Sequence, residues 1–371
     1  MVESRWFRRA GPAVAALGAI ALIASTTLGA PDRTWEPVAC AGAARVGNPS
    51  PGTWYRIDPA LRDGARVGQR LAVGRPGDRG ARTLELAAES FAAGPFGGTI
   101  VVGSDDGTRS RLSLIDVARA CAWLLAESTD VVRTATLAPD GATVFEHRVD
   151  RRTRVDLGIW RRAVDGSTSP VRVLPPIAPD ERFGPTWLTD LSWSDDGRSL
   201  AVQSCGEVAC RVRVLHPTGG ATRLVADPAM GDVVGLSGDR LVAHGACRGL
   251  PCPLLSLDLR GGPTVTLDPL AGQAVLSRDA QGRPVVVHEV ATAGDTLRMV
   301  GLDGRDPHLL PSDPDGRRLV AGPARSASAV ELAPGWILLG PDGRLPIDGA
   351  VRPVLRHVLD GRAVPLDEVS R

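Results

Sequence analysis

Short apolar segments alternate with turns rich in Asp and Gly over most of this 371-residue chain. Three segments share one pattern of apolar stretch, Asp/Gly turn and second apolar stretch: residues 131–149, 188–204 and 233–245. A fourth segment, 274–290, fits it more loosely. Asp and Gly suit such turns because both tolerate positive φ angles and Asp also bonds to nearby backbone. The pattern predicts pairs of antiparallel strands joined by tight turns.

A second turn recurs downstream of the first and sets the period of the chain. From Gly219 to Gly261 to Gly304 the spacing is 42 and then 43 residues, and GPDGRLPI at 340–347 continues the series. Four strands within about 40 to 45 residues is the size of one propeller blade. We therefore predict an all-β chain folded as a β-propeller of four-stranded antiparallel blades.

Two of these repeats carry a recognisable turn sequence, Leu-Ala-Pro-Asp-Gly at 137–141 and Trp-Ser-Asp-Asp-Gly at 193–197. The pattern of apolar strand, this turn and apolar strand resembles the repeat of TolB-like propellers, which have six to eight blades. The resemblance is clear in two repeats and partial in two more, within residues 131–313. It implies an interaction platform, and the repeat motif itself brings no catalytic residues.

Counting repeats favours seven blades, with six as the alternative. Six blades are expected at residues 98–127, 131–175, 185–228, 229–270, 272–313 and 315–348. The seventh would combine strands from residues 53–91 with the C-terminal segments VLRHVL and AVPLDE. A closing blade of this kind pairs the two ends of the domain and leaves no open sheet edge. Residues 53–371 are therefore expected to form one domain.

The N-terminal segment, residues 1–30, has the features of an export signal. Arg5, Arg8 and Arg9 precede an uncharged stretch from residue 10 to residue 30. A basic region followed by an apolar run is typical of a signal peptide, and a run this long also suits an uncleaved membrane anchor. Both alternatives place the chain outside the cytoplasm, secreted or anchored to the outer face of the membrane. Residues 31–52 are expected to be an extended linker.

An exported chain with an even number of cysteines is expected to form disulfides. The six cysteines are Cys40, Cys121, Cys205, Cys210, Cys247 and Cys252. Two pairs, 205/210 and 247/252, each enclose four residues between apolar runs, which predicts a bridge across a hairpin loop. Elimination leaves Cys40 and Cys121 as the third pair. A four-cysteine zinc site is the alternative, but its spacing is usually shorter.

The charge of the chain is balanced at +1, from 43 basic and 42 acidic residues, so it lacks the one-sided field of a nucleic-acid-binding protein. All the basic residues are arginines. This excludes Schiff-base chemistry, a P-loop and Ser-Lys catalysis, since each of them needs a lysine. No metal or cofactor motif is present, and we expect a monomer without a cofactor.

The innermost strand of each blade lines the central channel, where propellers usually bind ligands. The polar residues expected on these strands are Arg133, Asp190, Asp232 and Gln273. They are our candidate ligand-binding residues, and no catalytic residue is assigned. Three histidines, at 147, 244 and 288, fall in second strands. Second strands lie away from the channel, so a shared metal site there is not favoured.

These observations favour a binding or scaffold propeller whose partner is a protein or a small molecule. Contact with a membrane is expected only through the N-terminal segment. The alternative function is a metal-dependent enzyme of the lactonase or lyase type that uses acidic residues in the channel. Such an enzyme needs several titratable groups at one mouth of the channel, whereas these polar positions form no metal-ligand motif. We therefore favour a protein without enzymatic activity.

Overall fold

The computed structural model of the chain describes residues 38–41, 52–62, 65–75, 82–87, 89–176, 188–206, 210–216, 222–225, 230–245, 249–291, 296–320, 328–330, 332–340 and 353–365. The chain divides into two compact units, Met1–Asp32 and Arg33–Arg371. The predicted signal or anchor falls in the first unit and lies outside the described residues, as does most of the predicted linker. No helix of the described residues is long and apolar enough to cross a membrane.

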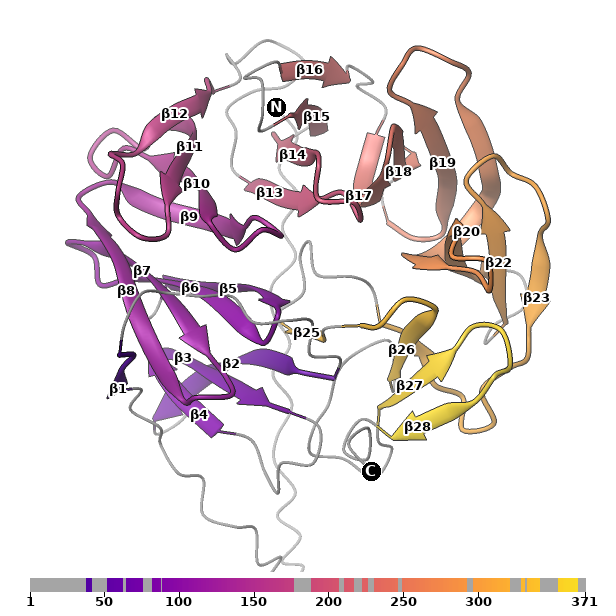
Figure 1. Cartoon of the computed structure of the whole chain (residues 1–371), viewed down its shortest axis with the longest axis horizontal. Coiled ribbons are helices and arrows are strands. Elements are labelled where there is room, and N and C mark those ends of the chain that lie inside the picture. The colour runs from indigo at the N-terminus through magenta and orange to yellow at the C-terminus, as the bar shows by residue number, and fades with distance from the viewer. Residues whose placement is uncertain are drawn as a thin grey trace, which may run out of the picture. The chain divides into compact units, whose positions relative to one another are not determined.

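All the elements in this part of the chain are strands, as predicted, and they form six hydrogen-bonded sheets (Figure 1). Sheet A has the order β25 (Ser328–Val330), β2 (Trp54–Arg62), β3 (Ala65–Gly74) and β4 (Arg82–Leu86). Sheet B has the order β1 (Val38–Ala39), β8 (Cys121–Ser128), β7 (Ser110–Asp116), β6 (Thr99–Asp105) and β5 (Glu89–Phe96).

The next two sheets are the four-stranded meanders that the sequence predicts at 131–175 and 185–228. Sheet C comprises β9 (Val131–Leu137), β10 (Thr143–Val149), β11 (Asp156–Ala163) and β12 (Val171–Leu174). Sheet D comprises β13 (Leu188–Trp193), β14 (Leu200–Cys205), β15 (Cys210–Leu215) and β16 (Thr222–Val225). Within each sheet, every strand pairs antiparallel with the strand that follows it in the sequence.

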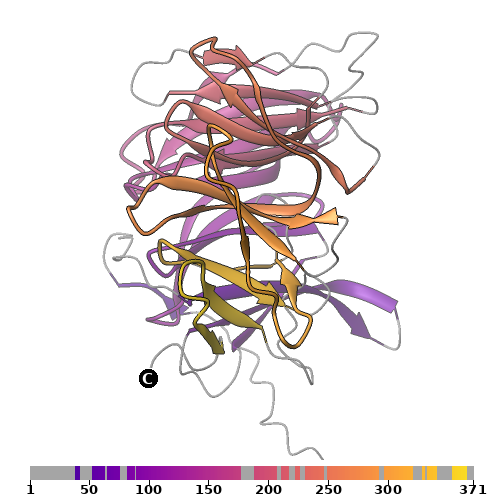
Figure 2. The same ribbon diagram turned by 90° about the vertical axis from the view of Figure 1, so that its right-hand side faces the viewer.

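Sheet E has seven strands, whose colour runs from salmon to orange in Figure 2. Its strands are β17 (Met230–Ser237), β18 (Arg240–Gly245), β19 (Cys252–Asp258), β20 (Val265–Arg278), β21 (Pro284–Val290), β22 (Leu297–Gly301) and β23 (His308–Leu310). The 14-residue β20 pairs with β19 through its first half and with β21 through its second half. It therefore joins two four-stranded halves, E1 (β17 to β20) and E2 (β20 to β23).

The last sheet, F, comprises β24 (Arg318–Leu319), β26 (Trp336–Gly340), β27 (Val354–His357) and β28 (Ala363–Pro365). Five of the six sheets thus have the size of one blade and the sixth has seven strands, so the expected seven separate blades are not found among the described residues. The predicted boundary between residues 270 and 272 falls inside β20, because the strand continues through it.

The predicted closure of the domain is also different from the observed one. The C-terminal segments VLRHVL and AVPLDE contribute β27 and β28, and β27 pairs with both β26 and β28. The partner of the N-terminal strand β2 is β25, with Trp54 opposite Val330 and Arg56 opposite Ser328. The segment expected as a blade at 315–348 is therefore divided between sheets A and F. A strand of three residues carries too little pattern to be recognised in the sequence.

The recurring turn is built as the sequence indicates, with glycine where the backbone needs a positive φ. In sheet C the N–H of Gly141 donates to Ala138 O at 2.8 Å, and in sheet D that of Gly197 donates to Ser194 O at 2.9 Å. Both glycines have a φ of 68°. An L side chain rarely adopts this conformation, so glycine ends both turns.

Apolar side chains from facing strands fill the interfaces between neighbouring sheets, which we call seams. Phe145 of β10 and Leu200 of β14 belong to one buried cluster at the seam between C and D, where Trp193 meets Phe145 edge to face at 5.3 Å. At the seam between E1 and E2, Val242 and Leu254 pack with Val286. The core is thus a series of apolar layers between sheets, and each layer is formed by buried side chains from the two sheets on either side of it.

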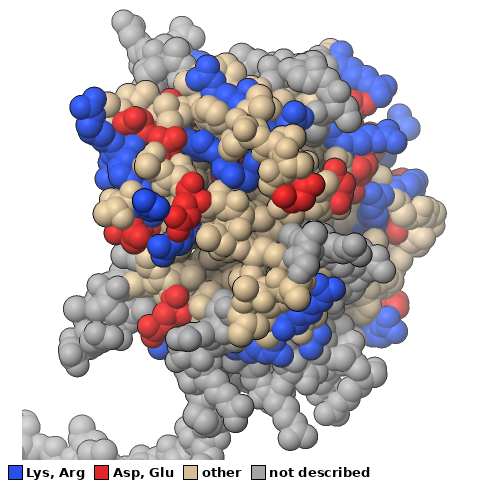
Figure 3. Space-filling model, turned by 60° about the vertical axis from the view of Figure 1, so that its left-hand side comes forward, with Lys and Arg blue, Asp and Glu red and all other residues tan. Residues whose placement is uncertain are grey.

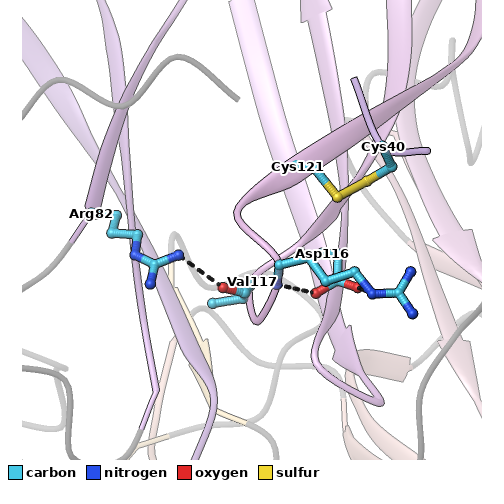
Figure 4. The surroundings of a disulfide bond; sticks show 6 residues. Cys40, Arg82, Asp116, Val117 and Cys121 are labelled. Atoms are coloured by element: carbon cyan, nitrogen blue, oxygen red, sulfur yellow. Dashed lines mark hydrogen bonds and ion pairs between the residues drawn. A yellow bond between two sulfur atoms is a disulfide. The ribbon is translucent and has the colours of Figure 1, made fainter. Parts of the chain in front are cut away.

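Two disulfides lie within the described residues, and both were predicted. Cys205 and Cys210 are directly opposite each other on β14 and β15 and form one bridge. Cys40 bonds to Cys121 across 81 residues, where the short β1 pairs parallel with β8 (Figure 4). The predicted Cys247–Cys252 bridge lies outside the described residues because Cys247 does.

Candidate functional site

The first strands of successive sheets lie beside one another, and we call β5, β9, β13, β17 and the second half of β20 the inner strands. β5 contacts β9, β9 contacts β13, β13 contacts β17, and β17 contacts β20. Figure 1 shows these strands on the side of each sheet that faces the other sheets. They form the wall on which the sequence places the candidate ligand-binding residues.

Three of the four candidates lie near the start of their strands. Arg133 is the third residue of β9, Asp190 the third of β13 and Asp232 the third of β17. Gln273 lies in the second half of β20. We call these four residues the inner-strand rim. Their strands contact one another in order, so residues far apart in the sequence lie on the same wall.

The rim residues differ in exposure. Arg133 and Asp232 are exposed, Gln273 is half-buried, and Asp190 is buried with 9% of its surface accessible. The Arg133 guanidinium contacts the Glu89 carboxylate of β5 at 3.2 Å, and both side chains are largely in solvent. The Asp232 carboxylate raises the pKa of the nearby His244, against the larger opposing effect of burial. The rim therefore presents groups of both signs and a neutral amide.

A second ion pair near the rim was not anticipated. Glu289, at the end of β21, is only 3% exposed, and its Oε1 accepts hydrogen bonds from Arg318 Nε at 3.1 Å and from the backbone N–H of Leu319 at 3.2 Å. Its Oε2 accepts one from Arg318 Nη2 and a longer one, 3.4 Å, from the Gln273 backbone N–H. One carboxylate thus connects the rim strand β20 to β24 of sheet F.

Glu289 is one of several buried polar side chains that bond to the backbone of the next sheet. The pairs are Tyr55 Oη to Ala92 O at 3.0 Å, Val132 N to Ser110 Oγ at 3.0 Å, Gln203 Nε2 to Gly231 O at 3.0 Å, and Leu319 N to Glu289 Oε1. Each crosses a different seam. Buried polar groups need such partners, and here the partners hold consecutive sheets in place and with them the rim.

The second-strand histidines lie where the sequence predicts, on β10, β18 and β21. They are not on consecutive sheets, however, because β14 of sheet D carries Gln203 at the corresponding seam. His147 Nε2 lies 2.9 Å from Asp156 Oδ1 within sheet C. His244 and His288 are close enough for charge on one to lower the pKa of the other. Val242 and Val286, two residues before these histidines, belong to one buried cluster, so both histidines lie at the seam between E1 and E2.

Titratable residues are common around these seams, but among the described residues no group of three or more His, Cys, Asp and Glu side chains could hold a metal ion. Figure 3 shows acidic and basic side chains interspersed over the face that it presents. For example, Arg109, just before β7, and Arg111 of β7 both contact Glu127 of β8 at 2.9 Å. The sequence prediction of a balanced surface agrees with this distribution.

The turns at the other ends of the inner strands are also tied together. Asp195, in the turn of sheet D, accepts hydrogen bonds from Ser237 Oγ of β17 at 2.8 Å and from Arg278 Nη2 of β20 at 2.7 Å. Sequence reasoning assigned Asp195 to the turn motif and missed this contact. The neighbouring Asp196 accepts the hydrogen bond from Ser194 Oγ within the turn. The only sequence signal for the contact was therefore that Asp195 is a second acidic residue in the same turn.

Comparison with known proteins identifies structural neighbours. No family model and no curated protein matches the sequence. A prolyl endopeptidase structure has a TM-score of 0.57 at 14% identity, covering 85% of this chain and 49% of its own. Oligogalacturonate lyase from Vibrio parahaemolyticus has a TM-score of 0.50 at 9% identity, with 84% of each chain covered. The chain thus spans about half the length of the endopeptidase.

TolB from Acinetobacter baumannii is also among the neighbours, with a TM-score of 0.44 at 14% identity, covering 76% of this chain and 67% of TolB. The described sheets, and the likeness to the prolyl endopeptidase and the lyase, agree with the fold that the sequence predicts. The chain is an all-β propeller. At such low identities the likeness of the prolyl endopeptidase and the lyase concerns the propeller fold alone, and the activities in their names stay with those proteins.

Proposed function

We propose that this propeller is an extracytoplasmic binding or scaffold module whose inner-strand rim takes a polar partner. The observation that carries the proposal is that Arg133, Asp190 and Asp232 lie near the start of three inner strands that contact one another in order. Polar side chains carried by contacting strands support a ligand site, because such sites use convergent polar groups for orientation and specificity.

The compartment in the proposal is supported by the two disulfides, Cys40–Cys121 and Cys205–Cys210, since such bonds persist mainly in oxidising compartments. The basic and apolar segment at residues 1–30 agrees with export, either cleaved or kept as an anchor. Membrane contact through that segment alone, and a monomeric state, are parts of the same proposal.

A binding role also agrees with how the charges near the rim are used. Glu89 is paired with Arg133, and the Glu289 carboxylate is held by Arg318 and two backbone N–H groups. A general acid or base has to exchange protons with a substrate, so it cannot be fully occupied by a structural ion pair. The lactonase- or lyase-like alternative would therefore have to rely on other groups.

The proposal is tested with a double variant of the rim, Asp190→Asn with Asp232→Asn. The probes are a defined panel of amino acids, dipeptides, polyamines and short oligosaccharides, and binding is read as a rise in Tm of the purified full chain. Glu127→Gln, which removes a carboxylate from the outer strand β8, is the matched control. We expect at least one probe to stabilise the parent and the control, but not the double variant.

A protein partner is tested in parallel by placing a photo-reactive side chain at position 273 or, as a control, at position 127. Irradiation in the producing cells should give a discrete cross-linked adduct from position 273 only. A ligand that stabilises the double variant as much as the parent, or adducts that form equally from both positions, would contradict a site at the rim.

A further inference from the structure

The seam between E1 and E2 differs from the other seams that a buried polar side chain crosses. Tyr55, Ser110, Gln203 and Glu289 each bond to the backbone of the neighbouring sheet. The corresponding polar side chains between E1 and E2 are His244 of β18 and His288 of β21. Within the described residues, His244 Nδ1 and His288 Nε2 are buried without a hydrogen-bond partner.

Both rings are deeply enclosed, with His244 6% and His288 0% exposed. Val242, two residues before His244, and Val286, two residues before His288, belong to the same apolar cluster. Because side chains two apart on a strand share a face, both histidines point into the seam between E1 and E2. The seam therefore continues from an apolar layer into a pair of imidazoles.

The charged groups that face the pair come from three further strands. On β17, Asp232 acts on His244. On β20, Asp268 Oδ2 lies 3.7 Å from His288 Nε2, beyond hydrogen-bond distance, and accepts a hydrogen bond of 2.7 Å from Arg298 Nη1 of β22. The fourth neighbouring strand, β19, presents the buried Leu254 opposite His244. The Asp268 carboxylate is thus already paired with Arg298, and a charged His288 would be repelled by the guanidinium of Arg298.

The energetic consequence is that the seam favours neutral rings. Burial lowers the pKa of His244, and charge on His288 lowers it further, while Asp232 raises it. Burial also lowers the pKa of His288, as does Arg298, whereas the Glu289 carbonyl and Asp268 raise it. Unfolded or opened chains bind protons on these rings near pH 6.5, and the closed seam does not. Stability from this source is complete above pH 6.5 and is lost as the pH falls from there toward the lowered folded pKa values.

We propose that the E1–E2 seam is a proton-sensitive latch, closed while one buried histidine from each half is neutral and loosened when mild acid charges them. The strand β20 joins E1 to E2 without a break, so loosening separates the faces of the seam while the chain connection stays intact. The same event would move Asp232 of β17 relative to Gln273 of β20. That consequence for ligand binding rests on the proposed function, but the latch itself does not.

The latch is tested by hydrogen–deuterium exchange of the full chain at pH 7.5 and pH 5.5, corrected for the intrinsic pH dependence of exchange. Protection in peptides covering β18 and β21 should fall in acid, by about tenfold for each unit of pKa depression relieved. The matched internal control is β10, where the buried His147 has Asp156 as a partner at 2.9 Å. Its protection should change much less.

Variants separate the two histidines from general acid effects. His244→Gln with His288→Gln should make protection in β18 and β21 independent of pH over this range, whereas the exposed-residue control His308→Gln should behave like the parent. If the double variant does not fold, the ring Cε1–H signals of the six histidines in the parent are titrated by NMR and assigned with the single variants. Two rings should then titrate below pH 6.5. Unchanged protection in acid, or normal titration of His244 and His288, would overturn the latch.

Discussion

The side-chain carbonyl of Gln203 on β14 accepts a hydrogen bond of 3.0 Å from the backbone N–H of Val233 on β17. The amide nitrogen of the same side chain donates to Gly231 O, also at 3.0 Å. The register between β17 and β18 shifts between Met230 and Val233. At this register shift, the side chain of Gln203 therefore forms hydrogen bonds with backbone groups of β17. A residue of sheet D thus satisfies backbone groups of sheet E.

We expect Gln203→Met to destabilise the propeller by about 2 to 3 kcal/mol, because it leaves a buried N–H and a buried C=O without partners. Gln203 is only 2% exposed, so water cannot replace the amide. The exposed Gln281→Met is the matched control and should change the free energy of unfolding by less than about 0.5 kcal/mol. Urea unfolding followed by tryptophan fluorescence measures both. Equal, small effects would show that the contact across the seam is dispensable.

The two observed disulfides should contribute unequally to stability. Cys40–Cys121 closes 81 residues and Cys205–Cys210 closes five. In the chain-entropy description, these loops correspond to about 4.5 and about 2 kcal/mol. Replacing Cys40 and Cys121 by Ala should therefore lower Tm more than replacing Cys205 and Cys210. Thermal unfolding of the two double variants gives the order, and the opposite order would indicate that packing around Cys205 outweighs loop closure.

The seam between sheets B and C should weaken in strong acid. Arg151 Nη1 and Nη2 hold the Asp105 carboxylate at 2.9 and 2.7 Å, and these hydrogen bonds, with one from Ser110, keep the pKa of Asp105 at about 2 despite its burial. Because the folded pKa is below the unfolded value near 3.9, the stabilisation is complete above pH 4 and is lost as the pH falls toward 2.

Asp105→Asn should remove this dependence on pH and cost about 1 to 2 kcal/mol at pH 7, a value reduced because Arg151 is partly exposed. The exposed Asp303→Asn is the control, since its pairing with Arg305 lies in solvent. Unfolding free energies measured at several pH values between 2 and 7 test the assignment. A parent protein whose stability is flat between pH 4 and 2 would rule it out.

The sequence predicted what depends on local chemistry and missed what depends on pairing between distant segments. The turns at Gly141 and Gly197, and the third-position residues of the inner strands, follow from repeated patterns. The continuity of β20 did not, because Pro269 and Gly272 indicate a break, whereas the strand accommodates them by register shifts between Leu254 and Leu255 and between Ala271 and Ala274.

Gly272 shows why such features are hard to read in advance. A Cβ at this position would lie 2.8 Å from Glu289 Oε2 and 2.9 Å from Glu289 Cβ. Glycine is therefore needed for the close approach of another strand, not for a turn. The partner of Glu289, Arg318, lies 29 residues further along the chain in another sheet. No local pattern links them, so this ion pair could not be predicted from the sequence.

The two ion pairs beside the rim provide the last prediction, because they have the same chemistry in different surroundings. Glu289→Gln should destabilise the propeller by about 2 to 3 kcal/mol, less than for a fully buried pair since Arg318 is half-exposed. Glutamine offers one acceptor where the carboxylate receives bonds from Arg318, Leu319 and Gln273, and its amide group would face other donors. Glu89→Gln, beside Arg133, is the matched control and should cost less than about 0.5 kcal/mol because both side chains are in solvent.

Urea unfolding of the two variants, repeated in 1 M NaCl, compares them directly. Salt should reduce any effect at Glu89 and leave most of that at Glu289, since buried pairs are screened much less. Equal losses at the two positions would mean that Glu289 does not hold sheet F against sheet E.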